Sequence, residues 1–184
     1  MVLFGAHCPD ARHRAYDLLA LAIKQEWGLS QLPSIERRNG GKPYFPARPD
    51  LEFNLSHSGS LLLCGLDVAP LGVDIQVIKS LRPGLPARVC SSLELDWLGD
   101  GADLWTRFAQ LWACKEAYVK YTGDGLTRSI AGIQVPLPIP ENSPIFFHGL
   151  WFRVFLGNGW AGAVCGESLP PTQIVHLPLG TTLP

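Results

Sequence analysis

Apolar residues along the first half of the chain follow two different periods, and each period predicts a different kind of element. Between residues 10 and 28 they return every three or four positions, which predicts an amphipathic helix with Asp10 as its N-cap and Gly28 as its stop. We expect the five or six residues before this helix to form a short edge strand. Alternating or continuous apolar residues predict strands at 51–55, 61–68 and 71–77.

The second half is predicted to hold the longest helix. It begins near Gly101 or Ala102 and ends at Gly123, because apolar residues recur at helical spacing without an interrupting glycine or proline. A shorter helix over about 91–97 is expected, with Ser91 or Ser92 as its cap. Strands are predicted at 130–135, 145–147, 151–156 and 160–165, with an edge strand at 174–177 in a Pro-rich tail.

This order of helices and strands predicts an α+β protein with small antiparallel sheets. Residues 79–86 combine charges with prolines and a glycine, a composition typical of a linker. We therefore expect two α+β units, an N-terminal half over residues 1–80 and a C-terminal half over residues 81–184.

The composition narrows the classes of function. A chain of 184 residues with 47% hydrophobic content can bury a core, and no apolar stretch approaches the length of a membrane span. The net charge of −1 argues against nucleic-acid binding, so an anionic ligand has to meet a local basic cluster. Five scattered cysteines without a C-x-x-C pair suggest buried thiols in a reducing compartment. Since the first residues show no signal-peptide pattern, we expect a cytoplasmic protein.

Three side chains of the predicted long helix share one stripe. Trp112, Glu116 and Lys120 are four residues apart and therefore face the same way. The group has two interpretations: an exposed ion pair beside a core tryptophan, which is common on helices, or a charged pair held half out of water at a functional site.

An acid interrupts an otherwise apolar strand. The apolar positions of residues 71–77 alternate and would face the core, so Asp74 and Gln76 share the opposite face. A buried carboxylate needs a partner, because an unpaired buried charge is very costly. Glu116 from the long helix could complete, with Asp74, a site for a hard cation such as magnesium.

A basic turn is a candidate anion site. Arg37, Arg38 and Lys42 surround Gly40 and Gly41, and glycine lets backbone N–H groups approach a phosphate. A solvated basic turn is the alternative.

We expect Ser56 and His57 at the polar turn that follows strand 51–55. A single histidine at a turn is usually structural or solvated. Neighbouring Ser and His residues do not by themselves make a hydrolase dyad, and no G-x-S-x-G motif is present.

Four motifs occur in one order: Gly41-Lys42-Pro43, then Asn54-Leu55-Ser56-His57-Ser58-Gly59, then Gly72-Val73-Asp74-Ile75-Gln76, then Trp112-x-x-Lys115-Glu116-x-x-x-Lys120, followed by Gly123-x-Gly125-Leu126. With them the chain resembles the 4′-phosphopantetheinyl transferases over about residues 10–165. Order, spacing and chain length are more similar to the monomeric type that activates surfactin synthetase than to the shorter trimeric holo-acyl-carrier-protein synthases.

The resemblance implies a fold and a reaction. The fold would be two similar α+β halves related by a pseudo-twofold axis, each a small antiparallel sheet packed on a long helix, with coenzyme A in the cleft between them. The enzyme would be a magnesium-dependent monomer. It would move the 4′-phosphopantetheine arm of coenzyme A onto a serine of an apo acyl or peptidyl carrier protein of fatty acid, polyketide or nonribosomal peptide biosynthesis, and release adenosine 3′,5′-bisphosphate.

The resemblance also implies roles at the reacting phosphates. Asp74 and Glu116 would bind magnesium on the pyrophosphate. Gln76 stands where the family usually has glutamate, so its amide oxygen or a water would complete the metal site. Lys115 and Lys120 would neutralise phosphate oxygens, with Lys120 stabilising the departing one. The proton of the carrier serine would pass to Glu116 or to a water on the metal, and both alternatives stay open.

On the nucleotide side, the resemblance implies that Lys42 contacts the nucleotide and that Ser56 and His57 contact the 3′-phosphate. The first helix of the family often supplies an arginine to this phosphate. This chain is expected to have Ala20 in its place, and Arg37 or Arg38 could compensate.

Two other classes of function remain open. One is a coenzyme A or nucleotide binding protein without catalysis, which the change to Gln76 permits. The other is a metal-dependent phosphoesterase that uses the same acids with water.

Overall fold

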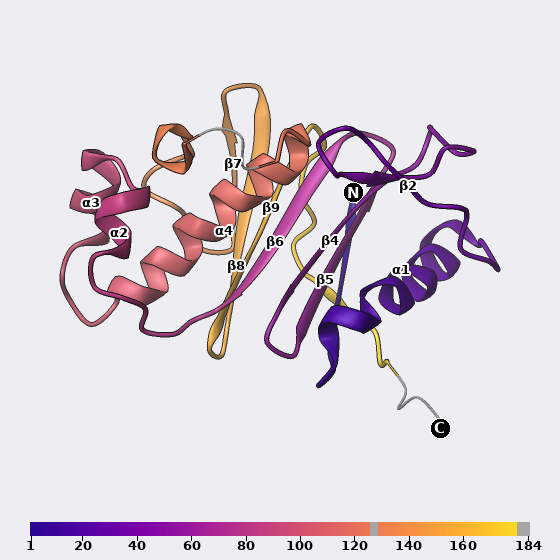
Figure 1. Cartoon of the computed structure of the whole chain (residues 1–184), viewed down its shortest axis with the longest axis horizontal. Coiled ribbons are helices and arrows are strands. Elements are labelled where there is room, and N and C mark those ends of the chain that lie inside the picture. The colour runs from indigo at the N-terminus through magenta and orange to yellow at the C-terminus, as the bar shows by residue number, and fades with distance from the viewer. Residues whose placement is uncertain (126–128, 180–184) are drawn as a thin grey trace.

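Two four-stranded sheets lie next to each other, and a long helix covers each of them (Figure 1). The structure is a computed structural model that describes residues 1–125 and 129–179. Its mixture of helices and mainly antiparallel sheets confirms the predicted α+β class.

The N-terminal sheet has the strand order β10-β1-β5-β4 and carries helix α1 (Ala11–Trp27). Its strands are β1 (Val2–His7), β4 (Glu52–Ser58), β5 (Leu61–Asp67) and β10 (Val175–His176). The predicted apolar face of α1 is buried against this sheet, and Gly28 ends the helix in the left-handed conformation, donating its N–H to the carbonyl of Ile23. The helix predicted over 10–28 is thus confirmed.

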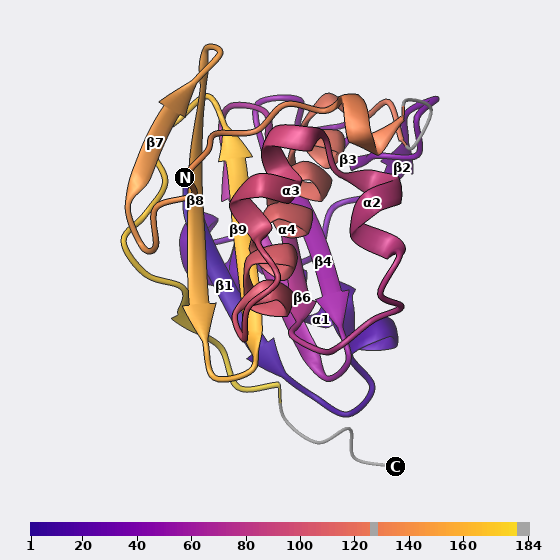
Figure 2. The same cartoon turned by 90° about the vertical axis from the view of Figure 1, so that its left-hand side faces the viewer.

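The C-terminal sheet has the order β6-β9-β8-β7 and carries helix α4 (Leu104–Thr122). Its strands are β6 (Leu71–Val77), β7 (Pro144–Phe147), β8 (Leu150–Gly157) and β9 (Trp160–Gly166). Two short helices follow β6: in the view of Figure 2, α3 (Ser92–Leu98) lies in front of α4 and α2 (Leu85–Val89) lies to the right of it. The expected serine cap of α3 is Ser91, in a capping box with Glu94.

Strand β6 separates two environments. Its residues Leu71, Val73 and Ile75 are buried in an apolar cluster between the two sheets, together with Leu3, Leu63, Phe155 and Val164. The intervening positions lie on the opposite face, as the alternation predicted, and Gly72 and Asp74 on this face contact α4. A Cβ atom at Gly72 would lie 2.0 Å from the carbonyl oxygen of Ala117, so the glycine is what allows α4 to approach β6 this closely.

Several local expectations are wrong. Residues 130–135 form no strand but begin with a 3₁₀ turn, η1 (Ile130–Gly132), where Gly132 interrupts the apolar run. The strand before α1 lies inside the sheet and not at its edge, because β10 pairs with β1 in parallel. Residues 56 and 57 belong to β4, which continues to Ser58. Helix α2 was missed because its start lies in the segment interpreted as a linker.

The remaining strands form a small hairpin of β2 (Glu36–Arg37) and β3 (Pro43–Tyr44), which carries the basic turn at its tip. Strands β6 and β10 each pair with a strand from the other side of the division expected at residue 80. Within 1–125 and 129–179, no helix has both the length and the apolarity needed to cross a membrane.

Candidate active site

The carboxylate of Asp74 is the centre of a buried polar cluster between β6 and α4. Its Oδ1 accepts hydrogen bonds from Ser56 Oγ and Lys120 Nζ, both at 2.7 Å, and its Oδ2 accepts one from Gln76 Nε2 at 2.6 Å. Only 3% of Asp74 is exposed. Three donors around one buried carboxylate satisfy the requirement that a buried charge be paired.

Lys120 joins the helix to the strand. Besides Asp74, its ammonium group donates to the carbonyl oxygen of Val73 at 3.1 Å. The lysine therefore pairs with the strand acid and not with Glu116, its neighbour one turn earlier. The interpretation of this stripe as a plain Glu–Lys surface pair is thereby wrong.

Glu116 is half-buried beside this cluster. Burial raises the pKa of its carboxyl group, the negative charge of Asp74 raises that pKa further, and Lys120 lowers it. Two carboxylates that repel each other in this way are relieved by a cation. With the amide oxygen of Gln76, they offer only hard oxygen donors, so these residues fit a magnesium ion.

A basic cleft of about 410 Å³ extends from Lys120 across the N-terminal half. Arg12 and Tyr16 of α1, Arg37 of the basic turn and His57 of β4 line it. Arg37 is held by two bonds, to the carbonyl oxygen of Gly41 at 2.8 Å and to the hydroxyl of Tyr16 at 3.4 Å. Arg12, Arg37 and Lys120 come from three segments that are far apart in the sequence. They line one concave surface, and this concentration of positive charge favours an anionic ligand.

The basic turn packs against the C-terminal end of α4. A Cβ atom at Gly40 would lie 1.6 Å from the carbonyl oxygen of Gly123, so only glycine allows this contact. Gly123 and Gly125 also line the cleft. Leu126, the last residue of that motif, lies outside the described residues.

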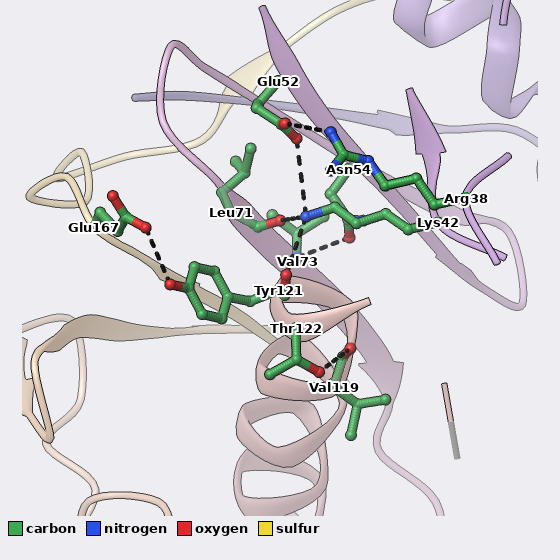
Figure 3. Close-up of polar contacts among 10 residues, drawn as sticks. All are labelled: Arg38, Lys42, Glu52, Asn54, Leu71, Val73, Val119, Tyr121, Thr122 and Glu167. Atoms are coloured by element: carbon green, nitrogen blue, oxygen red, sulfur yellow. Dashed lines mark hydrogen bonds and ion pairs between the residues drawn. The ribbon is translucent and has the colours of Figure 1, made fainter. Parts of the chain in front are cut away.

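Lys42 has a different environment from the one its motif implied. Its ammonium group donates to the carbonyl oxygens of Leu71 at 3.0 Å and Tyr121 at 3.1 Å, and lies 3.9 Å from Glu52 Oε2 (Figure 3). Burial lowers its pKa. Its side chain lines the cleft, while its charge links the start of β6 to the end of α4.

Arg38 lies outside this basic cleft. Its guanidinium donates to Glu52 Oε1 at 3.3 Å and lies over the ring of Tyr44 at 5.1 Å. Figure 3 shows it beside Lys42 and reaching toward Glu52. The structure thus brings Arg37, but not Arg38, to the candidate site.

Lys115 is also turned away from the cluster, although Glu116 follows it directly. Only 1% of it is exposed, and its ammonium group donates to Glu94 Oε2 at 2.8 Å. It also donates to the carbonyl oxygens of Val89 and Ile130. In this position it holds α2, α3 and η1 against α4.

Sequence reasoning missed Arg12 and Tyr16. An arginine of α1 does line the cleft, but it is Arg12, about two helical turns before Ala20. The signal was available in part, because Arg12 and Tyr16 are four residues apart and thus share one stripe of α1, which borders the apolar face.

Comparison with known proteins places this site in a family. Residues 70–165, more than half of the chain, match the family model described as the 4′-phosphopantetheinyl transferase superfamily. This segment contains Asp74, Gln76, Glu116 and Lys120.

The chain is similar to several curated relatives. It is 38% identical over 123 residues to a 4′-phosphopantetheinyl transferase of Bacillus subtilis, which covers 65% of this chain and 55% of that protein. It is 37% identical over 99 residues to 4′-phosphopantetheinyl transferase Sfp of Bacillus subtilis (strain 168), covering 53% of this chain and 44% of that one. It therefore spans about half the length of these two relatives.

A further relative is matched over most of its length. The chain is 34% identical over 142 residues to 4′-phosphopantetheinyl transferase AcpT of Salmonella typhi, and the match covers 72% of this chain and 71% of that protein. With the family model and this relative in agreement, the chain belongs to the 4′-phosphopantetheinyl transferase superfamily.

Proposed function

We propose that this chain transfers the 4′-phosphopantetheine arm of coenzyme A to a serine of an apo carrier protein. One observation carries the proposal: the basic cleft runs into Lys120, and Lys120 is bonded to an acid of the Asp74–Glu116 pair. A ligand with a phosphate on its ribose and a pyrophosphate between its nucleotide and a longer arm fits a basic cleft that leads to a pair of acids. Coenzyme A has that structure.

The reaction needs positioning and charge neutralisation more than covalent chemistry from the protein. The new bond joins the serine oxygen to the phosphorus that carries pantetheine. The bond that breaks joins this phosphorus to the bridging oxygen, which leaves with its electron pair on adenosine 3′,5′-bisphosphate. Glu116 takes the serine proton as general base, and Lys120 neutralises the departing oxygen.

Asp74, Glu116 and Gln76 would hold the magnesium ion that the family implies, and when bound this ion neutralises the pyrophosphate as a Lewis acid. Asp74 is already oriented by Ser56, and Gln76 by its bond to Asp74. Because Gln76 donates through Nε2, its amide oxygen is left to face a cation.

At the nucleotide end, Arg12, Arg37 and His57 would bind the 3′-phosphate. All three line the same cleft, and Arg37 is oriented by Gly41 and Tyr16. Lys42 anchors the Gly40–Gly41 turn to β6 and α4 through its bonds to Leu71 and Tyr121. We propose that backbone groups of this turn contact the nucleotide and that Lys42 holds them in place.

We further propose that the two sheets form the cores of two similar halves related by a pseudo-twofold axis. In each half a first strand precedes a long helix, and a later hairpin returns so that its second strand lies beside the first. The pattern is β1, α1, β4 and β5 in one half and β6, α4, β8 and β9 in the other. The division at residue 80 follows this pattern only approximately. The protein would act as a cytoplasmic monomer, and its five buried free thiols suit a reducing compartment.

The direct test uses the full chain with coenzyme A, magnesium and a panel of apo carrier proteins of fatty acid, polyketide and peptide synthesis. We expect one or more carriers to gain the mass of phosphopantetheine, with one equivalent of adenosine 3′,5′-bisphosphate released. Release of the bisphosphate without a carrier would indicate a phosphoesterase. Binding of coenzyme A without either product would indicate a non-catalytic binding protein.

Arg12→Ala is expected to weaken the binding of coenzyme A by about tenfold or more, because a charge-assisted bond to the 3′-phosphate is lost. Binding of 3′-dephospho-coenzyme A should change little. Calorimetric titration of both ligands measures the difference. Lys24→Ala, which removes an exposed cation from the last turn of the same helix, is the matched control. Equal weakening of both ligands would contradict the assignment of Arg12 to the 3′-phosphate, and His57→Ala tests the role of His57 in the same way.

Gln76→Glu is expected to lower the stability of the metal-free protein by about 1–3 kcal/mol, because a hydrogen bond to Asp74 becomes a contact between two carboxylates. The same change adds an anionic ligand, so magnesium should raise the melting temperature of the variant more than that of the parent. Thermal unfolding with and without magnesium measures both effects. Gln134→Glu, the same change at an exposed position, is the control. An identical magnesium response in parent and variant would mean that residue 76 does not face the metal.

A further inference from the structure

One edge of β6 pairs with the backbone of β9, and the N–H groups of its other edge bond to polar side chains of β4. Strands β4 and β6 belong to different sheets. Three successive outward N–H groups of β6 instead donate to side chains of β4: Val73 N to Asn54 Oδ1 at 3.0 Å, Ile75 N to Ser56 Oγ at 3.2 Å and Val77 N to Ser58 Oγ at 3.0 Å.

The spacing of these bonds is regular. Each pair is separated by 19 residues, so β4 and β6 run in the same direction and in register. Alternate residues of β4 face opposite ways, which separates the motif into two groups. The side chains of Asn54, Ser56 and Ser58 bond to β6, whereas Leu55 and His57 alternate with them. His57 lines the basic cleft, as does Asn54 at its wall, but Ser56 does not.

We call these three bonds from β6 N–H groups to Asn54, Ser56 and Ser58 the side-chain ladder. Ser56 differs from the other two members, because it also contacts the candidate site. Its Oγ accepts the N–H of Ile75 and donates its one hydrogen to Asp74 Oδ1 at 2.7 Å. The same Oδ1 accepts the ammonium group of Lys120. Only 6% of Ser56 is exposed, so its hydroxyl is committed to these two partners and is shielded from the cleft.

We propose that Ser56 is a positioning residue that acts through Asp74, and that it is not a ligand of the 3′-phosphate. The inference rests on the proposed function only in taking Asp74 as a metal ligand. A residue of the N-terminal sheet thereby orients an acid of the C-terminal sheet. The hydroxyl holds one oxygen of the carboxylate against β6 and so fixes the direction in which the group can receive a cation.

The test compares Ser56→Ala with Ser58→Ala in the full chain. Both variants lose one bond of the ladder, but only Ser56→Ala releases Asp74. Two binding measurements are made, neither of which needs turnover. Mn²⁺ serves as the probe ion, and electron paramagnetic resonance measures the free ion during its titration. Coenzyme A is titrated separately by calorimetry, in the presence of a chelator that removes divalent ions. We expect Ser56→Ala to weaken Mn²⁺ binding by about tenfold and to leave coenzyme A binding within about twofold of the parent. Ser58→Ala should change neither.

Two results would overturn the proposal. Weaker coenzyme A binding in the chelator, with Mn²⁺ binding intact, would make Ser56 a phosphate ligand. Equal losses of Mn²⁺ binding in both serine variants would make Ser56 an ordinary member of the ladder. If Ser56→Ala does not fold, Ser56→Cys keeps the side-chain volume while its thiol donates only weakly, and the same two titrations apply. Because no carrier protein is involved, the outcome is independent of whether transfer is observed.

Discussion

Glu116→Gln should reduce the rate of phosphopantetheine transfer on the order of a thousandfold while the fold remains intact. The carboxylate is assigned two tasks, to hold the cation and to accept the proton of the carrier serine, and the amide performs neither well. Loss of several kcal/mol of transition-state stabilisation corresponds to a rate change of this size. The fold should persist because the variant removes a half-buried charge that Asp74 already repels. The measurement is the rate of holo-carrier formation by mass spectrometry at saturating coenzyme A.

Varying magnesium separates the two tasks of Glu116. If excess magnesium restores most of the rate of Glu116→Gln, the residue serves mainly as a metal ligand. If saturating metal leaves the rate low, the lost proton acceptor is the cause. Glu26→Gln makes the same change on the exposed part of α1 and should leave the rate unchanged. A Glu116→Gln rate within tenfold of the parent at ordinary magnesium would remove this residue from both roles.

The elements that carry the candidate site could be predicted from local pattern. Strict alternation placed Asp74 and Gln76 on one face of a strand, and the structure has them bonded to each other on the face toward α4. Helical spacing placed Glu116 and Lys120 on one stripe, and both lie at Asp74. These predictions needed only the periods of a strand and a helix, which depend on neighbouring residues.

Other features depend on contacts between distant segments, and the local pattern does not contain them. The alternation of β4 separates Ser56 from His57, but it does not show that the face with Ser56 meets an unpaired strand edge of another sheet. Nor does it show that β10, with only two residues, continues the N-terminal sheet. The direction of Arg38 and Lys42 is likewise set by Glu52 and by backbone carbonyls from β6 and α4.

Lys115 shows how a motif can mislead. It stands directly before Glu116, and adjacent residues of a helix point about 100° apart. The two side chains therefore leave α4 in different directions, Glu116 toward Asp74 and Lys115 into the core. Placing Lys115 at the phosphates beside the magnesium ligand Glu116 ignores this rotation.

Glu94→Ala should lower the free energy of unfolding by about 3–5 kcal/mol, because it leaves the buried ammonium group of Lys115 without its counter-charge. Both side chains of this pair are almost fully buried, at 1% and 4% exposed, so water cannot replace the lost carboxylate. The variant also removes the capping box of α3, a smaller loss of about 1 kcal/mol. Urea denaturation measures the total.

Three further variants separate the ion pair from the other effects of this change. Ser91→Ala removes only the serine side of the cap and should cost about 1 kcal/mol. Replacing Lys115 by Met together with Glu94 by Leu removes both charges and should recover much of the stability lost in Glu94→Ala, since a buried ion pair contributes little net stability over apolar residues of similar size. Lys115→Met alone should destabilise the protein with little change in coenzyme A binding. If instead it binds coenzyme A at least tenfold more weakly and keeps its stability, Lys115 leaves Glu94 to meet a phosphate, and the role implied by the motif replaces the structural one.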